Sequence, residues 1–202
     1  MTELSQKDYF DSNLAKAHAV ERYVGNLTAL ETGADIEYKT GRDDYDFDVL
    51  YKPLSETQDK ITKHRVEVKY HATPYKYFVY EYMHAETFYP DCFLKSPSHK
   101  WVDVLSLTTA QWAQSMGLHN KVVILRHDTF ALRHKIGQML INPEHVSAGH
   151  IKTTVGAHYG YKKLLFQVDT RYALTAWKDN IWQVVPADVF YSVAGIARPE
   201  VK

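Results

Sequence analysis

Two stretches of the sequence decide the fold, Tyr45-Asp46-Phe47-Asp48-Val49-Leu50-Tyr51 and Arg65-Val66-Glu67-Val68-Lys69-Tyr70-His71. Successive side chains of a β-strand point to opposite faces of the sheet, so each stretch predicts a strand with one apolar and one charged face. The charged face carries Asp46 and Asp48 in the first stretch, and Glu67 and Lys69 in the second. If the strands pair as a hairpin, carboxylates from both strands and a lysine lie close together.

Further strands are expected on both sides of this pair. Residues 35–39 and 77–83 alternate and are rich in β-branched or aromatic side chains, and we expect them to join residues 45–51 and 65–71 as consecutive antiparallel strands. Four more segments have similar composition, at residues 101–107, 121–126, 163–169 and 182–185.

Two helices are expected. Asp11 or Ser12 is placed to cap a helix from about Asn13 towards Ala29, in which apolar residues recur at three-to-four spacing and Glu21 lies beside the apolar face. Residues 128–140 have the same periodicity, and Asn142-Pro143 ends that helix. This order of elements predicts an α+β fold, α/β/α-like, with a mixed central sheet flanked by helices.

The chain of 202 residues fits one globular unit. We expect a core at residues 1–140 and a β-rich C-terminal extension at residues 141–202 packed on it. No apolar run is long enough to span a membrane and the N-terminus has no secretory signal, so we expect a cytoplasmic protein. Cys92 is the sole cysteine, which excludes a disulfide or a cysteine zinc cluster within one chain.

Charge limits the function classes. Lysine plus arginine equals aspartate plus glutamate at 24 each, so bulk electrostatics does not favour a passive DNA-coating protein. A catalytic site needs only a local arrangement of charge. Carboxylates beside a lysine suit phosphodiester hydrolysis, because hard oxygen ligands bind Mg²⁺ and an ammonium stabilises phosphoryl charge. Glu21 could reach the same site from the first helix.

The tripeptide Glu-x-Lys is weak evidence by itself, because it occurs three times. Glu37-Tyr38-Lys39 is expected on the solvated face of an edge strand, and Glu200-Val201-Lys202 at a frayed terminus. Glu67-Val68-Lys69 is flanked by valine and follows an acidic strand, and this context selects it. Asp48 competes with Asp46 because both share a face; we favour Asp46.

Glu21, Tyr45-Asp46-Phe47 and Glu67-Val68-Lys69 together resemble the PD-(D/E)xK nuclease superfamily, in particular its small phage-encoded members. The likeness covers about residues 15–130, in element order more than in sequence. It implies a restriction-endonuclease-like core in which Asp46, Glu67 and the backbone carbonyl of Val68 bind Mg²⁺ or Mn²⁺.

The resemblance also implies residue roles and an activity. Lys69 corresponds to the catalytic lysine and Glu21 to an auxiliary metal ligand, while Glu81 resembles a glutamate found one strand later. The implied protein is a phage-encoded, Mg²⁺-dependent deoxyribonuclease of the host cytoplasm that leaves 5′-phosphate and 3′-hydroxyl ends. Its partner would be DNA. Separately from the resemblance, a homodimer is possible, because cutting a duplex takes two scissions.

Two other functions fit the sequence. One is a catalytically weakened protein of the same fold that binds nucleic acid or a protein, which neutral charge and Tyr70-His71 after Lys69 favour. The other is a structural component of a phage particle. In the C-terminal region His150, His158 and Tyr159 are the best functional candidates. Residues that could contact DNA elsewhere are Tyr75, Tyr77, Tyr80, Tyr82, Lys95, Lys100, Lys152, Lys162 and Lys163.

Overall fold

The structure is a computed structural model and describes residues 6–39, 45–52, 61–72, 76–87, 90, 92–158 and 161–199. It has an α+β fold with a six-stranded mixed sheet at its centre, in the order β1-β2-β3-β5-β6-β9. The strands are β1 (Asp35–Tyr38), β2 (Phe47–Tyr51), β3 (Thr62–His71), β5 (Lys100–Ser106), β6 (Lys121–Asp128) and β9 (Ile181–Pro186). Neighbours are antiparallel except β3 and β5, which are parallel.

A second, three-stranded sheet has the order β4-β8-β7, formed by β4 (Tyr77–His84), β8 (Tyr161–Asp169) and β7 (Ile151–His158). The prediction that residues 77–83 continue the antiparallel series is therefore wrong. Parallel strands need a crossover connection, and β4 with α2 (Cys92–Lys95) forms the crossover between β3 and β5. Phe78 and Tyr80 of β4 are buried in the core between the second sheet and the central sheet, together with Trp101.

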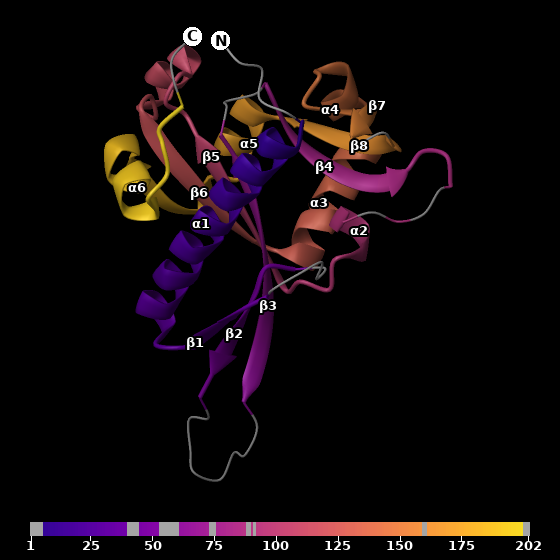
Figure 1. The fold of residues 1–202 in the computed structure, drawn as a ribbon. Helices are drawn as coiled ribbons and strands as arrows, with labels where there is room; N and C mark the ends of the chain where they lie inside the picture. The colour runs from indigo at the N-terminus through magenta and orange to yellow at the C-terminus, as the bar shows by residue number, and fades with distance from the viewer. Residues whose placement is uncertain are drawn as a thin grey trace.

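Two hydrophobic cores lie on the two faces of the central sheet. On one face, α1 (Gln6–Thr32) and α6 (Ala187–Ala194) cover valines of β2, β3 and β5, and Figure 1 shows α1 crossing this face with α6 beside it. On the other face, α3 (Thr129–Ile141), α5 (Thr170–Ala176) and the second sheet enclose Trp101, Leu105 and Leu125. This arrangement is the expected mixed sheet flanked by helices.

The first helix is longer than expected, because α1 begins at Gln6 and not near Asn13. The residues before Asn13 contain neither proline nor glycine, so Asp11 and Ser12 do not interrupt the helix. The second long helix agrees with its prediction: the Asp128 side chain accepts a hydrogen bond from the backbone N–H of Ala131, and Asn142 ends α3. Asn142 then caps the short helix α4 (Pro143–Ser147).

The region after residue 140 contributes to both sheets. β9 extends the central sheet beside β6, and β7 and β8 form the second sheet with β4. Short 3₁₀ helices lie at Gln111–Met116 and Lys178–Asn180. In the described part of the chain, no helix combines the length and apolar character needed to cross a membrane.

Candidate functional site

The candidate site lies where β2 separates from β3. Asp46 immediately precedes β2, and its backbone N–H donates a hydrogen bond to the carbonyl of Val66 (2.9 Å). Its side chain then turns along β3, where Oδ2 accepts a hydrogen bond from the backbone N–H of Val68 (2.6 Å). Two contacts to the same strand thus fix the Asp46 carboxylate beside Glu67-Val68-Lys69.

Glu67 and Lys69 lie on the face of β3 opposite Val66 and Val68. Glu67 is buried, and its Oε1 lies 2.5 Å from the Lys69 Nζ. The Lys69 ammonium also lies 5.8 Å from the centre of the Trp101 ring of β5. A buried carboxylate and a partly exposed ammonium therefore form an ion pair at the edge of the apolar core.

Glu21 of α1 interacts electrostatically with the same group. Burial raises the pKa of Glu21 to about 7, the charge of Lys69 lowers it and that of Glu67 raises it further. Burial likewise raises the pKa of Asp46 to about 6, with Lys69 lowering it and Glu21 raising it. Side chains from α1, the start of β2 and the middle of β3 thus act on one another's charge.

The donor set fits a hard divalent cation. Carboxylate oxygens are the preferred ligands of Mg²⁺, and the raised pKa values of Glu21 and Asp46 show that the positive charge of Lys69 does not compensate their burial. A bound cation would favour the ionised form of both groups. Within the described ranges, however, no three histidine, cysteine or acidic side chains are already arranged to hold a metal ion.

Asp48, the competing aspartate, belongs to a different cluster. Its Oδ2 lies 2.8 Å from the Nζ of Lys39 and 2.7 Å from the Nζ of Lys63, and the hydroxyl of Tyr45 donates to it at 3.3 Å. Burial raises the pKa of Asp48, but the hydrogen bonds and the positive charges of the two lysines together lower it by more. Lys39 also pairs with Glu37 on β1, the expected edge strand.

Other candidates lie elsewhere. Glu81 is on β4 and pairs with Lys163 of β8 (2.5 Å), and Tyr82 stacks on Phe166 within the same sheet. The Lys152 ammonium lies over the ring of Tyr77, so this lysine also has a role within the second sheet.

Several predicted residues or their side chains fall outside the described part of the chain: Tyr75, Cys92, His158, Tyr159 and the tripeptide at 200–202.

The structure also reveals a polar group that the sequence reasoning missed. Asp103 of β5 is buried beside Lys69 in the parallel register, and its oxygens contact His71 Nε2 (2.9 Å) and the hydroxyl of Tyr80 (3.1 Å). His71 follows Glu67 and Lys69 on the same face of β3. The detectable signal was an aspartate within the otherwise apolar run Trp101-Val102-Asp103-Val104-Leu105.

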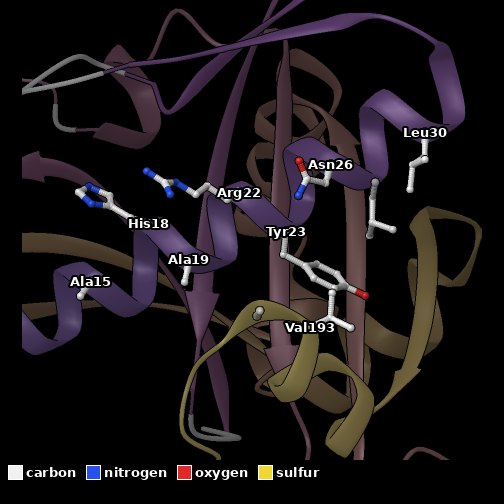
Figure 2. A pocket seen from close by; sticks show the side chains of 10 residues that line it. Ala15, His18, Ala19, Arg22, Tyr23, Asn26, Leu30 and Val193 are labelled. Atoms are coloured by element: carbon white, nitrogen blue, oxygen red, sulfur yellow. The ribbon is translucent and has the colours of Figure 1, made fainter.

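A groove of about 600 Å³ lies between α1 and α6, shown in Figure 2. It is lined by His18, Arg22 and Asn26 together with apolar side chains that include Leu30 and Val193. Glu21 is absent from its lining, because it projects from another side of α1. The groove is therefore separate from the carboxylate site.

Comparisons of the chain with protein-family models, with curated proteins and with solved structures each found no match.

Proposed function

We propose that this protein is a metal-dependent nuclease that hydrolyses phosphodiester bonds of DNA with Mg²⁺ or Mn²⁺. One observation carries the proposal: the Asp46 carboxylate is held on β3 beside the ion pair of Glu67 and Lys69, and Glu21 of α1 interacts electrostatically with these groups. The acidic groups come from α1, from the residue before β2 and from β3, and a solvated hairpin by itself does not account for a buried Glu67 beside the partly buried Glu21 and Asp46. The resemblance of these residues to the PD-(D/E)xK superfamily points to the same chemistry.

The carboxylates of Asp46 and Glu67 and the carbonyl of Val68 would hold the ion, with Glu21 as an auxiliary ligand. A divalent cation there supplies Lewis-acid polarisation of a phosphate and makes water a stronger nucleophile near neutral pH. The hydrogen bond from the Val68 N–H holds the Asp46 carboxylate in place before any ligand arrives.

Lys69 would stabilise the negative charge that develops on the phosphoryl oxygens. Its side chain is 38% exposed, so the ammonium can reach a ligand from solvent, whereas the Glu67 side chain beside it is 6% exposed. A preorganised cation of this kind contributes most when water is partly excluded, and the Trp101 ring shields one side of the ammonium.

A second function is favoured by a different observation. The Asp46 carboxylate is bonded to a backbone N–H, Glu67 is paired with Lys69, and the described residues present no ready group of three metal ligands. This arrangement fits a catalytically weakened nuclease fold that binds nucleic acid or a protein partner. The zero net charge agrees with weak nonspecific affinity for DNA.

The test measures cleavage of supercoiled circular, linear duplex, single-stranded and branched DNA in Mg²⁺ and in Mn²⁺, with a chelator control. We expect the parent to cleave, and Glu67→Gln and Lys69→Met to lose about 100-fold or more in rate. Glu37→Gln, in the other Glu-x-Lys of the described chain, and Lys52→Ala at an exposed position are matched controls that should keep the parent's rate.

Relaxation of circular DNA would show endonuclease activity, and shortening from labelled ends would show exonuclease activity. Absence of cleavage on all four substrates, or full cleavage by both variants, would refute the nuclease. Metal-independent DNA binding without cleavage would support the second function.

A further inference from the structure

Two histidines outside the carboxylate site are joined through their rings. His145 lies on α4 and His150 immediately precedes β7, and their Nδ1 atoms are 3.3 Å apart. The backbone fixes this approach, because the N–H of His150 donates to the carbonyl of His145 (2.9 Å). Gly149 makes the turn with a φ of +72°, a conformation that favours glycine.

Tyr172 of α5 orients both imidazoles. The His150 ring stacks on it with centroids 4.1 Å apart and planes inclined by 19°, and the His145 ring meets it at 67° with centroids 5.5 Å apart. Tyr172 is itself held at the start of α5, where its backbone N–H donates to the side chain of Asp169 (2.9 Å). The two nitrogens are thus positioned by three elements and not by the hydrogen bond alone.

The separation of these nitrogens matches a metal chelate. With Zn–N bonds of about 2.0–2.1 Å and tetrahedral angles, two ligand nitrogens of one zinc ion lie about 3.3–3.4 Å apart. The ion would sit off the line between them and take the place of the proton that joins the rings, so the imidazoles would turn towards it while the distance between the two nitrogens stays the same. We propose that His145 and His150 form a Zn²⁺ site that ties α4 to the start of β7.

The chemistry of this site differs from that of the carboxylate site. Imidazole nitrogens suit zinc and its transition-metal neighbours, whereas Mg²⁺ prefers oxygen. No third histidine, cysteine or acidic side chain joins the pair among the residues that the structure describes. Water would therefore complete the coordination, and the affinity would be that of a two-ligand site.

The site can be tested by titrating Zn²⁺ into the full chain in excess Mg²⁺, with calorimetry to count ions and measure affinity. We expect one Zn²⁺ ion whose binding weakens at least tenfold in His145→Gln and in His150→Gln. His134→Gln, at an exposed position of α3, is the matched control and should bind like the parent. Glu67→Gln should also keep the site, which separates this proposal from the nuclease.

A second measurement on the unaltered protein avoids any folding defect of the variants. In ¹H–¹⁵N spectra of the imidazole rings, Zn²⁺ should shift the Nδ1 resonances of two histidines together. Binding that is unchanged in both histidine variants, or no Zn²⁺ uptake with no paired Nδ1 shift, would overturn the proposal and leave the pair as a hydrogen bond.

Discussion

Two acidic clusters lie on the same hairpin, centred on aspartates two residues apart in sequence, and they have opposite electrostatic character. Asp48 is fully buried, and two lysines lie within 2.8 Å of its carboxylate. The charge of Glu21 raises the pKa of Asp46, and the cation that lowers it is Lys69, which also pairs with Glu67. The pKa of Asp48 is accordingly lowered, whereas the pKa values of Asp46 and Glu21 are raised.

The cluster around Asp48 is a structural ion cluster, whereas the site around Asp46 would be stabilised by a bound cation. A buried carboxylate with matched lysines is stabilised in the charged form, and losing one partner is costly. A carboxylate with too little positive charge nearby destabilises the metal-free protein at neutral pH, and such strained groups are frequent at functional sites. Substitutions in the two clusters should therefore have opposite effects on stability and activity.

The largest expected effect is on cleavage by Asp46→Asn. We expect the Mg²⁺-dependent rate to fall about 100-fold or more, because the substitution removes a charged oxygen ligand. The amide oxygen can still accept the hydrogen bond from Val68, so the free energy of unfolding should not fall. Initial cleavage rates and urea unfolding at pH 8 measure both quantities, and a rate within tenfold of the parent would contradict the assignment of Asp46.

Asp48→Asn should have the opposite outcome. Lys39 and Lys63 would lose their buried counter-charge, and we expect the free energy of unfolding to fall by about 2–3 kcal/mol. The cleavage rate per folded molecule should not change. Urea unfolding measures the stability, and the cleavage rate is measured under conditions in which the variant is fully folded. A loss of activity greater than that of Asp46→Asn would mean that Asp48, and not Asp46, is the functional aspartate.

The third prediction concerns pH. Folded Glu21 keeps its proton up to about pH 7, whereas the unfolded chain releases it near 4.5. Its contribution to stability is therefore complete below pH 4.5 and is lost as the pH rises through 7. Glu21→Gln, which cannot ionise, should match the parent near pH 4.5 and exceed it at pH 8 by on the order of 2 kcal/mol, allowing for partial solvent screening.

Urea unfolding of the metal-free parent and this variant at several pH values would show the difference growing between pH 5 and 8. A constant difference, or one that grows towards low pH, would mean that Glu21 is not held protonated by burial. Lys16→Ala on α1 offers a control on the same helix.

The smallest effect is expected for Glu37→Gln. Glu37 is 52% exposed and its pairs with Lys39 and Lys63 are screened by water, so the urea midpoint should not change measurably. Cleavage should also be unaffected. A clear loss of stability in low salt that disappears in high salt would show instead that Glu37 helps to hold the two lysines around Asp48.

Much of the fold follows from local patterns. Alternation predicted β1, β2, β3, β5, β6, β8 and β9, and three-to-four spacing predicted α1 and α3, although α1 begins earlier than expected. The short helices α2, α4, α5 and α6 were missed, because their signals extend over few residues. The strand β7 was missed because Gly149 and Gly156 indicated a loop in this stretch. The placement of β4 was wrong because pairing between strands depends on burial at long range and not on the composition of either strand.

The sequence alone determined the class of fold and which residues carry charge on each strand, since strand alternation is a local property of the backbone. Only the tertiary structure decided which charges meet. In the folded protein Asp46 is hydrogen-bonded to Val68 and Asp48 pairs with two lysines. Asp103 contacts His71, and His145 contacts His150. These contacts depend on strand register, on the crossover through β4 and on a glycine turn, which together set distances between atoms that no spacing in the sequence specifies.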